Sequence, residues 1–227
     1  EIWRRPMAAA GATPRKQRLS AERVLEGAVA LADEIGVEAL TIRKLAEALA
    51  TRPMSIYHHV AGKEAILDGM IDLVFAEIDP PPVDLDWKPA IRQRCLSARA
   101  VLACHPWAAP LMESRTNPGP ATLGHHDAVL GCLRRGGLSL EMTAHAYALI
   151  DSYVYGFALQ EANLPATGGA DMTEFAESII ERMPAKTYPH LAELTADYVL
   201  QPGYDFRSEF EFGLDLILDA LLAAANR

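Results

Sequence analysis

Hydrogen-bond donors and cations cluster in a short stretch of this 227-residue chain, between residues 41 and 63. DNA phosphates bind such groups, and base edges in the major groove bind short polar or apolar side chains near a helix N-terminus. Only one acidic residue, Glu47, interrupts the stretch. The candidate DNA-contacting residues are Thr41, Arg43, Arg52, Pro53, Met54, Ser55, Tyr57, His58, His59 and Lys63.

Two short helices joined by a tight turn would position these side chains. Ile42, Leu45 and Leu49 recur at helical spacing, and a second short helical pattern follows after a turn. The hydroxyl of Thr41 can cap the first helix, and Pro53 suits the first position of the second. The pattern predicts a helix-turn-helix, although a short helical hairpin with solvated histidines would look similar.

Three runs in one register narrow this choice: LTIRKLA at residues 40–46, SIYHHV at 55–60 and KEAIL at 63–67. With these runs, residues 20–75 resemble the N-terminal domain of the tetracycline-repressor (TetR) family. The resemblance implies a three-helix DNA-binding head. Its first helix is expected to begin after Ser20, which can cap it, and to end at Gly36.

The charge of the chain is divided unevenly. The net charge is −9, but residues 1–63 hold 10 Lys and Arg against 7 Asp and Glu, about +3, and the remainder holds 11 against 23, about −12. A basic head on an acidic body is compatible with DNA binding, because the local patch neutralises the phosphates. Residues 1–19 are predicted to form a flexible basic arm, which either reaches DNA or has no role.

Other functional classes have little support in the sequence. No apolar run of about 18 residues and no signal-peptide pattern occurs, so a cytoplasmic protein without a membrane span is expected. A metal site at His125, His126 and Asp127 is disfavoured, because adjacent histidines point to different faces of a helix. Phosphate-loop and serine-hydrolase motifs do not occur. We therefore expect neither an enzyme nor a cofactor. The three cysteines are expected to be reduced thiols: Cys95, Cys104 and Cys132.

The rest of the chain predicts an all-α protein, with a head at residues 20–63 and a body for ligand binding and dimerisation at 64–227. The helix expected at 64–78 has a broad apolar stripe and ends at the prolines 80–82, so it should connect head and body. Further helical segments are expected at 88–105, 107–113, 120–135, 140–164, 172–183, 191–199 and 206–225.

The body also resembles the C-terminal domain of the tetracycline repressor, through residues 105–107, 133–139 and 153–159. This resemblance implies a homodimer and a small-molecule inducer. Three positions depart from the family pattern: Ala50 replaces the usual turn glycine, Pro53 replaces a glutamine that can read adenine, and the histidine that helps to hold tetracycline and magnesium falls near Leu111 and Met112. A different operator is expected, and tetracycline is not supported as the inducer.

Polar and aromatic residues on otherwise apolar helices are candidates for an inducer pocket, although each also fits a packed core. They are His105, Trp107, Met112, Arg115, His126, Tyr147, Asp151, Tyr155, Phe157 and Gln160.

The last helix carries two apolar stripes. One holds Phe212, Leu216, Ala220 and Ala223. The other is predicted to form a four-helix dimer interface with the 140–164 helix and their symmetry mates, unless both helices are buried within one chain. Its residues are Phe210, Leu214, Ile217 and Leu221.

These patterns together predict a homodimeric transcription regulator, most simply a repressor, that binds a palindromic operator and is released by a small-molecule inducer. The alternative is a helical ligand-binding or catalytic protein whose head mediates protein contacts. A steep salt dependence of affinity for duplex DNA would distinguish the two, because only phosphate neutralisation releases counterions.

Overall fold

The computed structural model describes residues 18–112, 114–165, 167–182 and 185–225. The predicted arm at residues 1–19 lies almost wholly outside this range. Every regular element in the described ranges is helical, and the only β-type pairing in them is an isolated bridge between Gly168 and Asp205. The predicted all-α class is confirmed.

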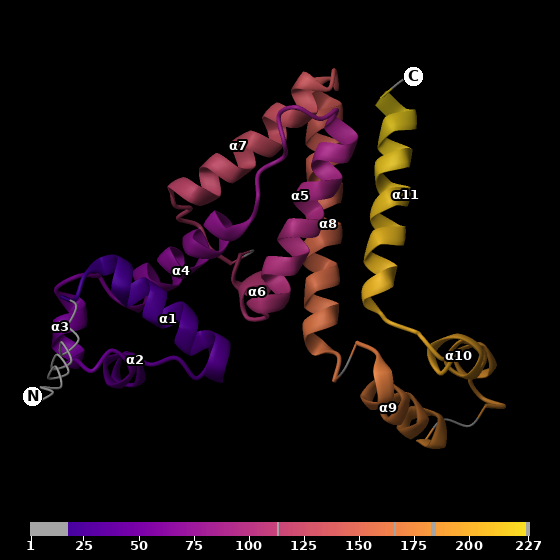
Figure 1. Cartoon of the computed structure of the whole chain (residues 1–227), viewed down its shortest axis with the longest axis horizontal. Helices are drawn as coiled ribbons and strands as arrows, with labels where there is room; N and C mark the ends of the chain where they lie inside the picture. The colour runs from indigo at the N-terminus through magenta and orange to yellow at the C-terminus, as the bar shows by residue number, and fades with distance from the viewer. Residues whose placement is uncertain (1–17, 113, 166, 183–184, 226–227) are drawn as a thin grey trace, which may run out of the picture.

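Three helices form the head: α1 (Ala21–Ile35), α2 (Ile42–Ala48) and α3 (Pro53–Tyr57) (Figure 1). Both predicted caps are present, because Ser20 Oγ accepts a hydrogen bond from Arg23 N and Thr41 Oγ1 accepts one from Lys44 N, each at 3.2 Å. The head has a small core that includes one side chain from each helix, Val24, Leu45 and Ile56, all at most 1% exposed.

Helix α4 (Lys63–Glu77) runs from the head into the body (Figure 1). It packs against α1 on the head side and against α6 and α7 on the body side. Its buried residues include Ile66, Met70 and Val74, which belong to the predicted apolar stripe. The expectation that this helix connects the two parts is therefore met.

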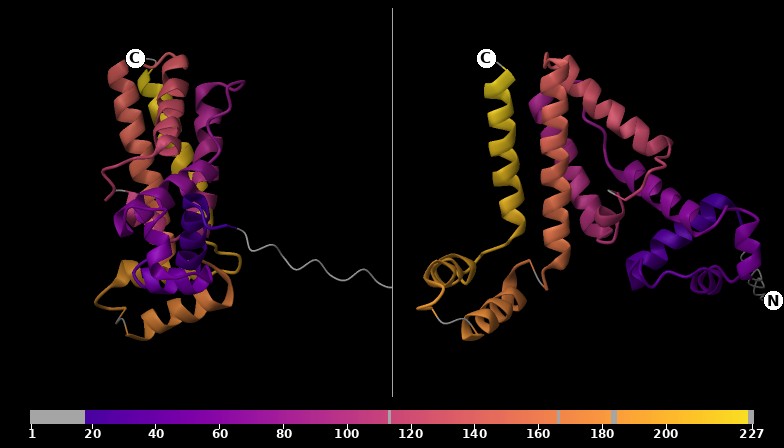
Figure 2. Two further views of the ribbon diagram at one scale, coloured as in Figure 1. Left: turned by 90° about the vertical axis from the view of Figure 1, so that its left-hand side faces the viewer. Right: turned by 180° about the vertical axis from the view of Figure 1, so that it is seen from behind.

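The body is built around three long helices that run side by side: α5 (Trp87–Cys104), α8 (Leu140–Asn163) and α11 (Arg207–Ala225) (Figures 1 and 2). Two further helices, α6 (Ala108–Met112) and α7 (Pro120–Arg135), lie between this group and α4. None of the helices in the described ranges combines the length and apolar character needed to cross a bilayer.

A separate group of helices projects beyond one end of the long helices (Figure 2). It contains α9 (Gly169–Arg182), α10 (Pro189–Leu194) and the π-helical turn η1 (Thr195–Val199). The predicted 172–183 segment corresponds to α9, although Met183 lies outside the described residues. The short piece predicted at 191–199 falls on α10 and η1.

Candidate functional site

The turn between α2 and α3 is tight and strained. Ala50 has a left-handed backbone with φ of 50°, a conformation that costs residues other than glycine roughly 1–2 kcal/mol. The backbone N–H groups of Ala50 and Thr51 close the turn by donating to the carbonyls of Glu47 at 3.0 Å and Ala46 at 2.9 Å. Alanine at this position therefore does adopt the conformation that favours glycine.

Helix α3 is held by one buried side chain, and most of its other side chains are exposed. Ile56 is fully buried, whereas Met54 is 67% and Tyr57 is 47% exposed. Pro53 occupies the first turn, as predicted, and Arg52 makes no side-chain capping bond. An exposed methionine and tyrosine beside cations suit contacts with thymine methyl groups and phosphates.

The predicted DNA-contacting residues lie at the start of α2, on α3 and the turn after it, and at the start of α4. Nine of the ten are exposed, and Ser55 is half-buried. The Arg43 side chain pairs with Glu47 at 3.2 Å, with 85% of the Arg43 side chain exposed. Such an exposed pair stabilises a helix little, so a phosphate can replace Glu47 as the partner of Arg43.

A cavity of about 740 Å³ lies in the body between α4, α6, α7 and α8, within the range of about 300–1,000 Å³ that is usual for small-molecule sites. Six of the ten predicted pocket residues line it: Met112, Arg115, His126, Tyr147, Asp151 and Tyr155. The other lining residues were not predicted from the sequence: Asp68, Ile71, Phe75, Ala109, Pro110, Asn117, Pro118, Thr122, Ala148, Ser152, Gly156 and Leu159. The spacing of residues 148, 152, 156 and 159 along one helix face could have identified part of this set.

Four predicted pocket residues lie elsewhere. Phe157 faces away from the cavity, since it is two residues beyond Tyr155 on the helix, and it stacks on Phe206 with ring centroids 4.8 Å apart. Gln160 is exposed. His105 and Trp107 are buried, but between the head and the body.

The polar groups on the cavity wall are mostly neutral hydrogen-bonding groups. Tyr147 Oη lies 2.5 Å from His126 Nδ1. Burial lowers the pKa of His126, and Asp151 opposes this only in part; burial and then Asp151 raise the pKa of Tyr147. Both side chains are therefore uncharged near pH 7, and the cavity can exchange hydrogen bonds with ligand hydroxyl and carbonyl groups.

Behind this wall lies a buried cluster that we call the interior cluster (Arg94, His125 and Asp151). The Arg94 side chain is 0% exposed, donates from Nε to His125 Nε2 at 2.9 Å and pairs through Nη1 with Asp151 Oδ1 at 3.2 Å. Burial, followed by the positive charge of Arg94, lowers the pKa of His125 to about 3. The cluster therefore holds one ion pair and one neutral histidine, and it fixes Asp151 at the cavity.

Helix α4 is tied to the cavity by its acidic side chains. Arg115 Nη1, at the cavity, bonds Glu64 Oε2 in the first turn of α4 at 2.7 Å and Asp68 Oδ1 at 3.4 Å. One turn further along, Asp72 Oδ1 accepts from the backbone N–H of Thr122 at 2.8 Å, at the start of α7. Arg115 and Thr122 thus connect the cavity wall directly to α4, and a displacement of the wall can move α4 through these contacts.

The two stripes of α11 have different surroundings. Of the predicted dimer-interface residues, Phe210 and Leu214 are 0% and Leu221 is 5% exposed, and Ile217 is half-buried. The assignment of this stripe to a dimer interface needs correction, because its side chains already pack within the chain, against α8 and α5. The second stripe is exposed, with Phe212 at 66% and Leu216 at 57%.

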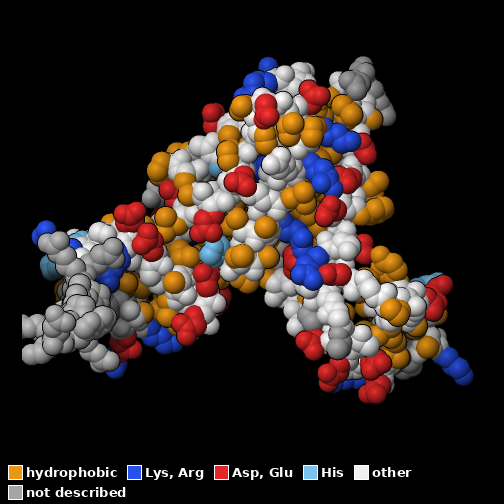
Figure 3. Space-filling model, in the orientation of Figure 1, with side chains coloured by type: hydrophobic (Ala, Val, Ile, Leu, Met, Phe, Trp, Pro, Cys, Tyr) orange, Lys and Arg blue, Asp and Glu red, His pale blue; other side chains and the backbone are white. Residues whose placement is uncertain are grey.

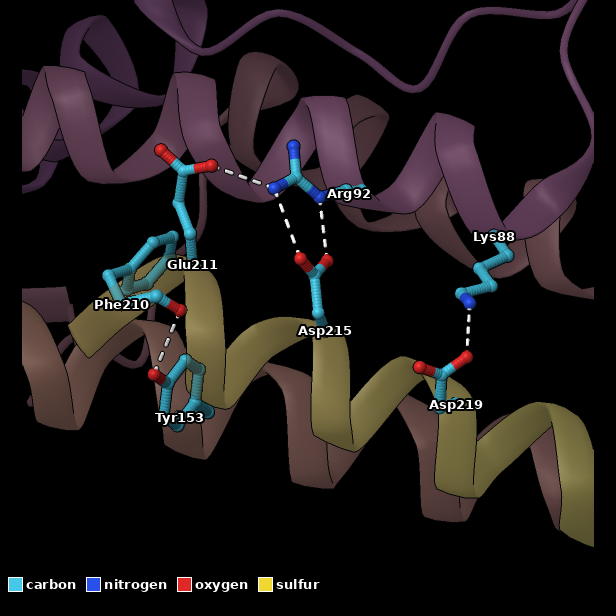
Figure 4. Close-up of polar contacts among 7 residues, drawn as sticks. All are labelled: Lys88, Arg92, Tyr153, Phe210, Glu211, Asp215 and Asp219. Atoms are coloured by element: carbon cyan, nitrogen blue, oxygen red, sulfur yellow. Dashed lines mark hydrogen bonds and ion pairs between the residues drawn. The ribbon is translucent and has the colours of Figure 1, made fainter. Parts of the chain in front are cut away.

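Ion pairs fix which face of α11 turns inward (Figure 4). Arg92 of α5 bonds Asp215 at 2.6 Å and Glu211 at 2.7 Å, and Lys88 pairs with Asp219. On the α8 side, Tyr153 Oη donates to the carbonyl of Phe210 at 3.0 Å. Because α5 and α8 cover these two sides of α11, the face that carries Phe212 and Leu216 points outward.

Comparison with known proteins connects both parts of the fold to one family. Residues 24–70 match bacterial regulatory proteins of the tetR family, and residues 79–225 match the tetracyclin repressor-like C-terminal domain. The transcriptional repressor DrrR1 of Streptomyces coeruleorubidus is 34% identical over 91% of this chain and 78% of its own length. The class A tetracycline repressor of Escherichia coli is 30% identical over 90% of this chain and 91% of its own length.

A solved structure gives the same result in three dimensions. ActR of Streptomyces coelicolor, in complex with actinorhodin, superposes with a TM-score of 0.76 at 28% identity, covering 92% of this chain and 98% of ActR. The two proteins thus share one fold over most of both chains. The chain belongs to the TetR family of bacterial transcriptional regulators.

Proposed function

We propose that this regulator represses transcription by binding a palindromic operator as a homodimer, and that a small molecule in the cavity releases it from DNA. The observation that carries the proposal is the course of α4. The helix begins at the exposed Lys63, beside the α3 surface, and lines the cavity with Asp68, Ile71 and Phe75. One rigid element therefore belongs to both candidate sites. Such a protein acts where the chromosome lies, in the cytoplasm.

In the bound complex, α3 enters the major groove. Arg43, Met54 and Ser55 meet base edges there. Tyr57, His59 and Lys63 position the head on phosphates. The acidic body supports this orientation, since Asp and Glu side chains are spread over its visible face (Figure 3) and would be repelled by the DNA backbone.

Two heads must stand about one turn of DNA apart to occupy successive major grooves. We assign the contact between the two chains to the outward stripe of α11, with Phe212, Leu216, Ala220 and Ala223. Hydrophobic side chains gather along this outer edge of the body (Figure 3). Leu216→Glu should yield a monomer in sedimentation, whereas Leu123→Glu, at an equally exposed site on α7, should leave the dimer intact.

The cavity favours an aromatic ligand that carries hydroxyl or carbonyl groups. Phe75, Tyr147 and Tyr155 offer aromatic surface, and His126 and Asp151 offer hydrogen bonds. The structure of ActR with actinorhodin supports this ligand class. Ligand contacts with Arg115 would compete with its bond to Glu64 and displace α4. The ligand must bind the displaced state more tightly, by a few kcal/mol, to release DNA.

The first experiment is selection of bound duplexes from a random pool by the purified full chain. We expect a palindrome whose half-sites lie about one helical turn apart, and affinity that falls steeply with salt. Arg43→Ala and Tyr57→Ala should each weaken binding, whereas Arg182→Ala on α9 makes the same charge change as Arg43→Ala far from the head and should not. No enrichment at low salt would contradict the proposal.

The proposed binding of a small molecule in the cavity is tested by filling the cavity with a larger side chain. Gly156 lines it, and a side chain there meets no atom within 4 Å of its Cβ, so Gly156→Leu should fold and occupy the space. Gly124→Leu on α7 is the matched control, because its Cβ also meets nothing and it does not line the cavity. With actinorhodin as the first compound of an aromatic panel, any compound that releases the duplex should act on the control and not on Gly156→Leu. Equal release from both variants would place the ligand elsewhere.

A further inference from the structure

His105 and Trp107 join the body to the head. His105 Nδ1 lies 2.7 Å from Asp33 Oδ1 of α1, and His105 Nε2 lies 3.1 Å from Glu77 Oε2 at the end of α4. Trp107 Nε1 donates to the same Asp33 oxygen at 2.7 Å. We call this set the junction cluster (Asp33, Glu77, His105 and Trp107).

The junction cluster joins two buried aromatic side chains, His105 and Trp107, to two more exposed carboxylates, Asp33 and Glu77. The His105 side chain is 8% exposed, the Asp33 side chain is 31% exposed, and Trp107 is 7% exposed. The His105 and Trp107 rings also meet edge to face, with centroids 5.9 Å apart. An imidazole ring can donate to two carboxylates only when both of its nitrogens carry protons. Both contacts are therefore hydrogen bonds only when His105 is positively charged.

The cluster reaches the cavity by a short path that does not use α4. Trp107 directly precedes α6, and the first residue of α6, Ala108, donates its N–H to the carbonyl of His105 at 2.9 Å. Ala109, Pro110 and Met112 of α6 line the cavity. A displacement of α6 by a ligand would thus be felt at Asp33 of α1.

We infer that His105 is a positioning residue that, together with Trp107, sets the orientation of the DNA-binding head by holding Asp33 of α1 against α6. This inference rests on the proposed function. A head held both by α4 and at α1 has fewer orientations than a head held by α4 alone. It therefore loses less conformational freedom when two heads bind one operator.

The contact should weaken as the pH rises. The charged groups that face the His105 ring are Asp33 from α1 and Glu77 from α4. Burial lowers the pKa of His105, but the hydrogen bonds and charges of the two carboxylates outweigh it, and the net pKa is raised. A histidine with a raised folded pKa contributes its full stabilisation below the unfolded value of about 6.5, and loses it as the pH rises through the folded value.

The test compares the full-length protein with His105→Gln, Trp107→Phe and the control His145→Gln, a histidine exposed on α8 beside Glu141. Hydrogen exchange of the α1 amides and affinity for the selected duplex are measured at pH 6.5 and 8.5. At pH 6.5, His105→Gln should exchange faster in α1 and bind DNA roughly fivefold more weakly, at the low end of typical coupling effects. Trp107→Phe, which keeps an aromatic side chain of smaller size and removes the Nε1–H donor, should change both in the same direction by less.

The pH profile separates positioning from simple structural support. The unmutated protein should approach the behaviour of His105→Gln at pH 8.5, whereas His145→Gln should follow the unmutated protein throughout. If the unmutated protein binds the duplex but His105→Gln matches it in affinity and α1 exchange at both pH values, the inference is overturned and the proposed function stands. If the unmutated protein selects no duplex, the proposed function itself fails, and the role of the cluster in DNA binding fails with it.

Discussion

His105 and His125 are almost equally buried, at 7% and 6% exposure, yet their surroundings push their pKa values in opposite directions. His105 lies between two carboxylates, in the junction cluster. His125 accepts a hydrogen bond from the Arg94 cation, in the interior cluster. Burial disfavours the charged form of both rings, so the sign of the neighbouring charge decides the difference.

The difference separates a fixed part of the molecule from an adjustable one. With a pKa of about 3, His125 stays neutral at any physiological pH, and the Arg94 side chain beside it is 0% exposed and pairs with Asp151 at the cavity. The junction cluster is partly open, since the Glu77 side chain is 52% exposed, and the pKa of its histidine is raised by the two carboxylates despite burial. The interior cluster thus keeps the same charges across the physiological pH range, whereas the charge of the cluster between head and body can respond to pH.

The largest expected effect comes from breaking the interior ion pair. Asp151→Ala leaves the fully buried Arg94 without its carboxylate, and we expect a loss of about 3–5 kcal/mol in the free energy of unfolding by urea. The double variant Arg94→Met with Asp151→Leu removes both charges and should recover most of this loss. A cost below about 1 kcal/mol for Asp151→Ala would mean that the Arg94–Asp151 pair behaves like a solvent-exposed pair.

The pH dependence of stability should differ in sign between the two clusters. Because the folded pKa of His125 is lowered from about 6.5 to about 3, its contribution is complete above pH 6.5 and is lost as the pH falls towards 3; at pH 5 the loss is about 2 kcal/mol. His125→Gln should therefore lose less stability than the unmutated protein between pH 7 and 5. His105→Gln should differ from the unmutated protein in the opposite range, most at pH 6 and least at pH 9. If the free energies of unfolding of all three proteins changed in parallel with pH, the two clusters would not differ as predicted.

The smallest expected effect comes from a substitution in the turn of the head, which belongs to neither cluster. Ala50→Gly relieves the left-handed strain in the turn, where φ is 50°, and should raise the free energy of unfolding by about 0.5–1 kcal/mol. The gain should add to the effect of Asp151→Ala within about 0.5 kcal/mol, because the sites share no partner. A larger deviation would show that the interior cluster and the head are coupled, and that the fixed and adjustable parts are not separate.

Local features were predictable from the sequence. The caps at Ser20 and Thr41, the proline at the start of α3 and the course of α4 follow from hydrogen-bonding groups and helical spacing within a few residues. The two family resemblances extended this to the whole fold. The pocket was only partly predictable: residue type identified Tyr147, Asp151 and other polar groups, but the same reasoning also selected Phe157 and Gln160, which lie on other faces of α8.

By itself, the sequence determined the helices, the helix-turn-helix, the charge difference between head and body, and the family, because each depends on local spacing or on runs of residues in one register. Only the tertiary structure decided which stripe of α11 is covered, that His105 meets Asp33 from 72 residues away, and that one buried histidine faces carboxylates and another faces arginine. These outcomes depend on which helices pack against each other. A helical pattern predicts that one face of the helix will be buried, but it does not predict which element will cover that face.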